Sequence, residues 1–186
     1  STLKRNWSCW LHALLSAWVG ETGYKGKFFI EPGRYVVAEC GVLLGTVHAT
    51  KFNGENRYVG TDLGFNVLVR PAMYDSFHDI EIFRDGGEPD AELVEQSIVG
   101  NICESGDILA KKRMLPLIKE GDIVAALDAG AYGFVMSSSY NQRPRAAEAV
   151  HDRTRRTADA VLDSLPVNGT SALFERLALF KYGDPL

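Results

Sequence analysis

Three short segments of this chain place reactive or anion-binding side chains next to glycine. They are Glu-Pro-Gly-Arg at 31–34, Cys-Glu-Ser-Gly-Asp at 103–107 and Gly-Ala-Tyr-Gly at 130–133. Glycine allows the backbone to bend tightly and a ligand to come close, which is how loops that carry chemistry are usually built. We therefore interpret the three segments as half of an active site.

The first segment combines a carboxylate with a guanidinium group. Glu31, at the end of an expected strand, could keep the ring nitrogen of a pyridinium cofactor protonated, and Arg34 could bind a phosphate or carboxylate through two hydrogen bonds. Pro32 and Gly33 fix the bend between them. The alternative is a loop with a surface ion pair.

The other candidates are a thiol, a phenol and a second arginine. Polar neighbours around Cys103 favour an exposed thiol that can donate a proton, although a turn with a buried thiol is the alternative. Tyr132 lies between small residues, so its hydroxyl could bind a ligand oxygen, or its ring could simply pack at a turn. Pro71 disfavours helix at Arg70 and predicts that this guanidinium lies on a loop, near Tyr74.

The elements that position these residues follow from apolar spacing. Trp and Leu residues between Trp7 and Trp18 recur every three or four positions, which predicts an amphipathic helix that ends near Gly20 and Gly23. Residues 27–30 predict a short buried strand that runs into Glu31. This helix-strand-loop order is typical of the closing unit of an α/β domain.

The middle of the chain predicts mostly strands. After a short helix at 35–41, strands are expected at 42–51, 57–61, 80–83, 95–99 and 123–127, with a hairpin at Asn53-Gly54. Glycine breaks are expected at 86–87, 106 and 120–122. Residues 146–179 predict helices again. The fold class is therefore mainly β with flanking helices (α+β).

Composition excludes several classes of protein. The 186 residues carry a net charge of -4 and a pI near 5.6, which gives no electrostatic reason to expect nucleic acid or an anionic membrane as partner. Apolar runs are interrupted before about 18 residues, and we expect no membrane span and no secretory signal. Three cysteines without CxxC spacing, and histidines without ligand spacing, predict reduced thiols, no metal and a cytoplasmic chain.

Four stretches in order resemble the C-terminal part of the diaminopimelate decarboxylases, over about residues 27–150. They read EPGRYVVAECGVLLGTVHATK, VGTDLGFNVLVRPAMYDSFHDIEI, GNICESGDILA and LDAGAYGFVMSSSYNQRPRAAEAV. Those enzymes are pyridoxal-phosphate decarboxylases of the alanine-racemase-like fold, in which a (β/α)8 barrel carries the cofactor lysine. A C-terminal domain, a β-barrel of Greek-key type, completes the site across a dimer interface.

The resemblance implies three regions. Residues 1–41 would be the last unit of a truncated barrel, 42–150 the β-rich decarboxylase domain, and 151–186 a helical tail of open role. The cofactor lysine has no counterpart, so the chain should be inactive alone.

The resemblance also implies roles for the candidate residues. Glu31, Gly33, Arg34 and Tyr132 would contact the cofactor. Arg34, Arg70, Tyr74, Glu104 and Tyr132 would bind the substrate, with Glu104 on its distal ammonium group. Cys103, reaching into the neighbouring subunit's site, would protonate the carbanion left when carbon dioxide departs.

The implied reaction is decarboxylation of meso-2,6-diaminopimelate to L-lysine by a homodimer that uses pyridoxal phosphate. Glutamate after the cysteine favours this substrate, because ornithine decarboxylases resemble Cys-Asp at that point. Two alternatives stay open. One is the C-terminal portion of a lysine/ornithine-type decarboxylase, and the other is a non-catalytic dimerisation module of the same fold.

Overall fold

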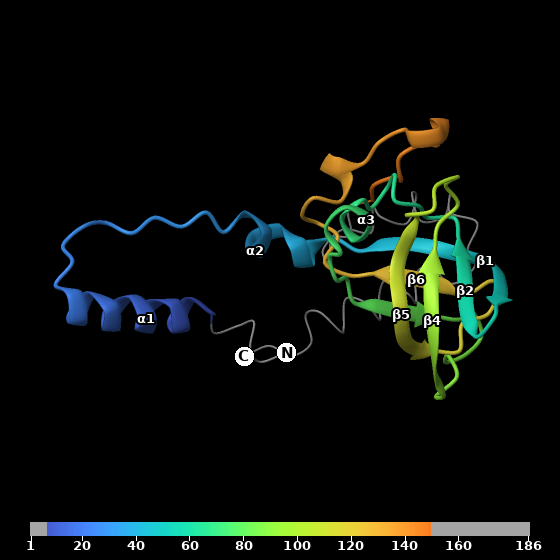
Figure 1. Cartoon of the computed structure of the whole chain (residues 1–186), viewed down its shortest axis with the longest axis horizontal. Coiled ribbons are helices and arrows are strands. Elements are labelled where there is room, and N and C mark those ends of the chain that lie inside the picture. Colours follow the sequence, from blue (N-terminus) through green and yellow to red (C-terminus); the bar gives the residue numbers. More distant parts are fainter. Residues whose placement is uncertain (1–6, 150–186) are drawn as a thin grey trace. The chain divides into compact units, whose positions relative to one another are not determined.

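The computed structural model describes residues 7–149, and the side chains of residues 9–149 (Figure 1). The chain divides into two compact units between Pro32 and Gly33, and each is described by itself. The division expected at residue 41 stays a prediction.

The first unit contains the predicted N-terminal helix, α1 (Trp7–Thr22). Gly23 ends it in the left-handed conformation (φ 67°), with its N–H bonded to the carbonyl of Val19 at 2.9 Å. The rings of Trp18, Tyr24 and Phe28 form a cluster with centroids 5.2–5.8 Å apart. The helix is therefore confirmed, although Trp10 is 67% exposed.

The strand expected at residues 27–30 is wrong. That segment has no regular structure, and Phe29 is 86% exposed. A barrel strand is held by hydrogen bonds to parallel neighbours, and none of the described residues pairs with this segment. Its apolar composition alone does not create a strand.

The second unit is a six-stranded sheet in the order β3-β6-β1-β2-β4-β5. The strands are β1 (Leu43–Asn53), β2 (Asn56–Thr61), β3 (Ile80–Phe83), β4 (Leu93–Val99), β5 (Ile108–Pro116) and β6 (Ile123–Ala126). Neighbours are antiparallel except β2 and β4, which are parallel. This is the mainly-β class that the sequence predicts.

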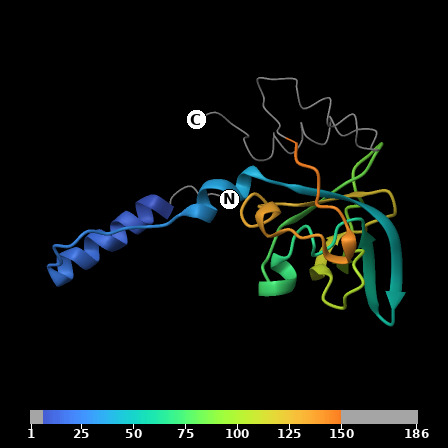
Figure 2. The ribbon, with the colours of Figure 1, turned by 90° about the horizontal axis from the view of Figure 1, so that it is seen from above.

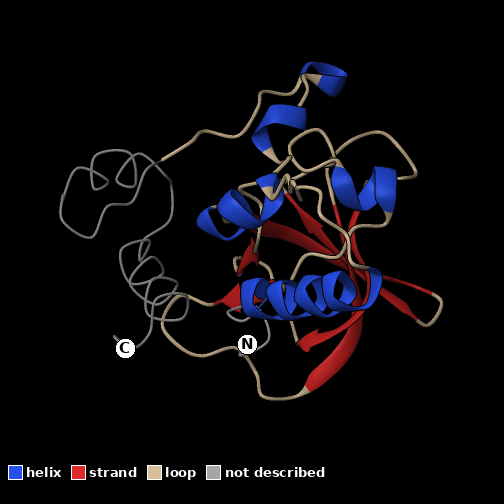
Figure 3. Cartoon of the chain, turned by 90° about the vertical axis from the view of Figure 1, so that its left-hand side faces the viewer, coloured by secondary structure: helices blue, strands red, loops and turns tan. Residues whose placement is uncertain are grey.

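The long strand β1 curls the sheet. Its first half pairs with β6 and its second half with β2, and the register shifts between Val47 and Ala49. Figure 2 shows this long strand bending along its length. Such a shift bends a strand and increases its twist. The strands curve around a core in which Val47, Val59, Ile98 and Val124 are at most 1% exposed (Figure 3).

The two edge strands are linked by one side chain. Arg113, on β5, donates a hydrogen bond to the carbonyl of His78 at 3.1 Å, two residues before β3. Its guanidinium carbon lies 3.8 Å from the ring centroid of Phe77. The sheet is therefore a nearly closed barrel.

An ion-pair network joins the end of β3 to the turn before β6. Arg84 donates two hydrogen bonds of 2.8 Å to Asp122, which is 2% exposed, and Asp122 raises the pKa of the guanidinium. Asp90 accepts from Lys119 at 3.0 Å and from Arg84 at 3.2 Å. The hydrogen bond from Lys119 has the larger effect and that from Arg84 the smaller, and both lower the pKa of Asp90.

Most of the expected elements of this unit are confirmed. The five predicted strands, the hairpin at Asn53-Gly54 and the short helix, here α2 (Gly33–Val37) with η2 (Ala38–Cys40), are all present. The sequence did not predict β5. The helices expected from 146 to 179 lie outside the described residues, except 146–149, which have no regular structure.

The loop expected at Arg70 is wrong. Arg70 begins a short helix, α3 (Arg70–Tyr74), in which Pro71 occupies the first turn. Proline is tolerated there because the N–H that it lacks has no partner within the helix. Asp75 ends the helix in the left-handed conformation (φ 52°).

Candidate active site

Side chains from three distant segments meet around Tyr132. The guanidinium carbon of Arg34, on α2, lies 5.1 Å from the centroid of the Tyr132 ring, and that of Arg70, on α3, lies 5.3 Å from it. Arg70 also lies 5.0 Å from the ring of Tyr74. We call Arg34, Arg70, Tyr74 and Tyr132 the arginine–tyrosine cluster. All four are candidate site residues in the sequence analysis.

The loop that carries Tyr132 is held against η2 by its backbone. Ala129 donates to the carbonyl of Gly41 at 2.9 Å, and Gly130 donates to the carbonyl of Ala38 at 3.0 Å. A Cβ on Gly130 would collide with the carbonyl oxygen of Val37. Glycine is therefore required at 130, and it brings Tyr132 to the side of α2 where Arg34 lies.

Tyr132 has an unusual backbone conformation. Its φ is 60°, in the left-handed region that costs a non-glycine residue on the order of 1 kcal/mol or more. The neighbouring Ala131 is 4% exposed and anchors the turn, whereas the ring of Tyr132 stays 46% exposed. The phenol of Tyr132 therefore faces outward, where a ligand can reach it.

Arg70 has an unused hydrogen-bond donor. One terminal nitrogen donates to Ser76 Oγ at 3.3 Å, but the buried Nε has no partner. A buried donor without an acceptor is unfavourable by about 1–3 kcal/mol. With Arg34 nearby, two permanent positive charges flank one exposed ring. This arrangement can bind an anionic group, such as a phosphate or a carboxylate.

The thiol lies on a separate loop. Residues 100–107, which we call the thiol loop, connect β4 to β5 and expose Cys103 and Glu104. Exposure of the thiol agrees with the sequence prediction. Glu104 Oε1 accepts the N–H of Gly106 at 3.4 Å, which bends the loop behind the thiol.

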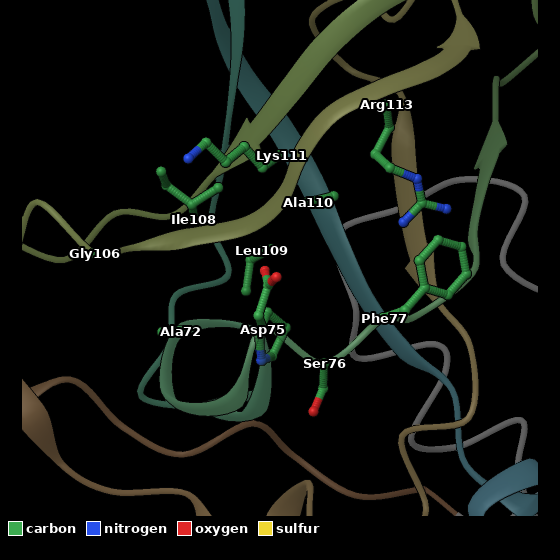
Figure 4. A pocket seen from close by; sticks show the side chains of 11 residues that line it. Ala72, Asp75, Ser76, Phe77, Gly106, Ile108, Leu109, Ala110, Lys111 and Arg113 are labelled. Atoms are coloured by element: carbon green, nitrogen blue, oxygen red, sulfur yellow. The ribbon is translucent and has the colours of Figure 1, made fainter.

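A hollow of about 320 Å³ separates α3 from the start of β5 (Figure 4). Ala72 lines it from α3 and Asp75 from the residue that ends this helix, and Gly106 and Leu109 line it from the thiol loop and β5. Arg70 and Tyr74, of the same helix, do not line the hollow. Helix α3 therefore takes part in both the cluster and the hollow.

Two predicted residues lie elsewhere or contact little. Glu31 belongs to the first unit. Gly33 begins α2, and space is open around it. Sequence reasoning missed Ser76, the Gly41–Gly130 contact and the buried carboxylate of Asp107. In the sequence a glycine indicates only a break or a turn, and no sequence signal indicates that Gly41 and Gly130 meet.

Within residues 7–149, no set of three or more His, Cys, Asp or Glu side chains could hold a metal ion. None of the helices described is long and apolar enough to cross a membrane.

Residues 34–158 match the family described as pyridoxal-dependent decarboxylase, C-terminal sheet domain. The chain belongs to this family. The match begins one residue after the start of the second unit. The predicted resemblance and fold class are thereby confirmed.

Known decarboxylases match the same region. A diaminopimelate decarboxylase of Archaeoglobus fulgidus is 50% identical over 125 residues, which are 67% of this chain and 29% of that protein. One from Buchnera aphidicola is 41% identical over 157 residues, covering 76% of this chain and 38% of that protein. The chain thus spans about a third of the length of these decarboxylases.

Solved decarboxylase structures agree. A crystal structure of diaminopimelate decarboxylase has 38% identity and a TM-score of 0.65, covering 78% of this chain and 38% of the other. The Helicobacter pylori enzyme complexed with L-lysine has 39% identity and a TM-score of 0.55, covering 62% and 27%. The Vibrio vulnificus lysine/ornithine decarboxylase, at 24% identity, shares the fold.

Proposed function

We propose that this chain is the C-terminal portion of a diaminopimelate decarboxylase, which converts meso-2,6-diaminopimelate to L-lysine and carbon dioxide. One observation carries the proposal. Two guanidinium groups converge on Tyr132 in a chain that is 50% identical to an enzyme of that name. The L-lysine complex of a relative with 39% identity supports an amino-acid ligand.

The cluster fits a phosphorylated cofactor or a carboxylate substrate. Arg34 and Arg70 supply charge, the unpartnered Nε of Arg70 supplies a donor, and the Tyr132 hydroxyl supplies a further hydrogen bond. In our proposal Arg34, Gly33 and Tyr132 contact pyridoxal phosphate, while Arg70 and Tyr74 hold the substrate carboxylate that is retained. Glu31 lies against the pyridine nitrogen and keeps it protonated.

Bound pyridoxal phosphate supplies an electron sink for the pair left when the bond to the departing carboxylate breaks. This chain supplies the replacing proton. Cys103 Sγ holds it, and the exposed thiol loop carries it into the site of a second copy in a homodimer. Glu104, one residue on, binds the distal ammonium group of the substrate.

The chain alone should not catalyse, because the lysine that bonds to the cofactor lies in polypeptide outside it. The cysteines of the described part, Cys9, Cys40 and Cys103, are exposed and unpaired, which supports a reducing compartment such as the cytoplasm. In our proposal the residues before Gly33 correspond to the last unit of the cofactor-binding barrel, although residues 27–30 form no strand in this structure.

The test uses the full-length decarboxylase that carries this sequence. Cys103→Ala should lower kcat with meso-diaminopimelate by about 10²-fold, the scale for losing a general acid. Cys9→Ala, another exposed cysteine, is the matched control and should keep the wild-type rate. An unchanged rate for Cys103→Ala would remove its role.

Substrate choice separates the alternatives. The wild-type enzyme should turn over meso-diaminopimelate faster than L-lysine or L-ornithine. Preference for either of the latter would assign the chain to a lysine/ornithine-type decarboxylase. No turnover of any of the three by a dimer that binds pyridoxal phosphate would indicate a dimerisation module.

A further inference from the structure

Asp107, the last residue of the thiol loop, carries a buried carboxylate. The residue is 4% exposed. Its Oδ2 accepts the N–H of Ile102 at 2.7 Å, and its Oδ1 accepts the N–H of Phe65 at 2.6 Å. Ile102 immediately precedes Cys103. The carboxylate thus bonds the backbone directly next to the thiol.

The other partner belongs to the segment that leads into α3. Phe65 lies in a turn in which Val67 and Leu68 donate to the carbonyl of Gly64 at 3.0 and 3.3 Å. Two residues after Leu68, Arg70 begins α3. One carboxylate therefore ties the thiol loop to the segment that positions the arginine–tyrosine cluster.

The backbone around Asp107 leaves room for its carboxylate and closes the loop around it. A Cβ on Gly100 would collide with Oδ2 of Asp107, so only glycine leaves room for the carboxylate. The backbone closes the same loop, since Gly100 donates to the carbonyl of Asp107 at 3.0 Å and Asp107 donates to that of Glu104 at 3.1 Å. Burial raises the pKa of Asp107, against the hydrogen bonds from Ile102 and Phe65 and the charge of Arg143. An apolar residue would avoid this desolvation, so the hydrogen bonds are what the aspartate contributes.

We propose that Asp107 is a positioning residue for proton delivery, which fixes the thiol loop so that Cys103 Sγ reaches one defined place. This inference rests on the proposed function, because Asp107 takes no part in the reaction itself and matters to it only if Cys103 donates the proton. The effect of Asp107 on the proton transfer is exerted through Cys103.

The first test needs no activity and uses this chain. Asp107→Asn keeps the shape but turns an amide N–H₂ toward one of the two N–H donors, so the amide of Ile102 or Phe65 loses its acceptor. Hydrogen exchange of that amide should become at least about ten-fold faster, the change expected when a hydrogen bond of about 1.4 kcal/mol is lost. Asp62→Asn is the matched control, because its amide oxygen can still accept the N–H of Thr46, 2.8 Å away in the wild type.

A second variant serves as the test if Asp107→Asn does not fold. Gly100→Ala keeps Asp107 in the sequence, but the added Cβ would push its carboxylate away from the N–H of Ile102. Hydrogen exchange of the Ile102 amide should therefore become faster in this variant as well. Unchanged protection of Ile102 and Phe65 in both variants would overturn the inference. Global loss of protection in both, with Asp62→Asn intact, would make Asp107 a folding residue and overturn the positioning role too.

The second test is a double-mutant cycle in the full-length enzyme. Asp107→Asn should lower kcat by about 10-fold to 10²-fold, the scale for misplacing a reacting group by about 1 Å. In a Cys103→Ala background the same substitution should lower kcat no further. An equal loss in both backgrounds would show that Asp107 does not act through the thiol.

The controls separate the two proposals. Ile118→Val, at a core residue with 0% exposure that lies outside the thiol loop, lowers stability and should leave kcat unchanged. If Cys103→Ala itself keeps the wild-type rate, the proposed role of the thiol has failed. If Cys103→Ala is slow and Asp107→Asn is not, only the positioning inference has failed.

Discussion

The loop of Tyr132 and η2 approach each other closely through their backbones, and Gly130→Ala tests this approach. The new Cβ would overlap the carbonyl oxygen of Val37 and press on that of Ala38. Both are main-chain atoms, which cannot rotate away as a side chain can. The loop must therefore move as a whole and carry Tyr132 with it.

The expected loss of stability follows from what the shift breaks. Two backbone hydrogen bonds, from Ala129 to Gly41 and from Gly130 to Ala38, contribute about 0.5–1.5 kcal/mol each. Overpacking of a close contact costs about 1–3 kcal/mol. We expect Gly130→Ala to lower the free energy of unfolding by about 2–6 kcal/mol, and Tm by at least about 4 °C for a unit of this size.

The assay must follow the second unit. All tryptophans of the chain, Trp7, Trp10 and Trp18, belong to α1 in the first unit, so tryptophan fluorescence does not report on the sheet. Urea unfolding should be followed by far-ultraviolet circular dichroism in the strand region.

Gly87→Ala is the matched control. No atom lies within 4 Å of its added Cβ, and its φ is not in the left-handed region. It should change stability by less than about 1 kcal/mol, with either sign. If Gly130→Ala unfolds at the same urea concentration as Gly87→Ala and the wild type, the close approach is not a constraint and our account of how Tyr132 is positioned is wrong.

Three other predictions concern charge. Arg84→Met removes the cationic partner of the buried Asp122 carboxylate, which then keeps only the N–H of Lys119 among the described residues, and should lower the free energy of unfolding by about 3–5 kcal/mol; a change below about 1 kcal/mol would mean that the pair is not buried in solution. The lowered pKa of Asp90 means that its ionised form contributes stability above the ordinary value of 3.8, and this contribution disappears as pH falls through the lower folded value. The stability gap between wild type and Asp90→Asn should therefore be larger at pH 6 than at pH 3, and a constant gap would contradict the pairing with Lys119. In the full-length enzyme, Glu104→Gln should raise KM for meso-diaminopimelate more than it lowers kcat, since a binding contact is lost; a pure kcat effect would oppose the assigned role.

Local patterns predicted the elements whose neighbours are close in sequence. The hairpin at Asn53-Gly54 and the helix Trp7–Thr22 depend on turn chemistry and spacing that lie within one window. Strand β5 was missed because Lys111, Lys112 and Arg113 interrupt its apolar residues. Arg113 contacts Phe77 and the backbone before β3, so its charge has a partner that no local pattern reveals.

The errors come from context that lies outside the local pattern. Residues 27–30 have strand composition, but a parallel strand exists only where neighbours offer hydrogen bonds. Pro71 predicts a loop by its effect on the residue before it, yet the first turn of a helix has no need of the N–H that proline lacks. The side chains of Arg34, Arg70, Tyr74 and Tyr132 were named from residue type, whereas their convergence depends on backbone contacts between residues 38–41 and 129–130.

The candidate site divides into two parts with different surroundings, the arginine–tyrosine cluster and the thiol loop. The arginine–tyrosine cluster has a buried, unpartnered donor, so it is prepared for an acceptor that this part of the chain does not supply. Cys103 and Glu104 are exposed on a loop whose backbone is tied down at Ile102 by a buried carboxylate. An exposed thiol exchanges its proton with water at once, so it can protonate a carbon centre stereospecifically only after another surface has excluded the water. A loop that is rigid at its base and uncovered at its tip is suited to insertion into a second polypeptide, and this physical requirement is why we expect the homodimer to be needed for catalysis.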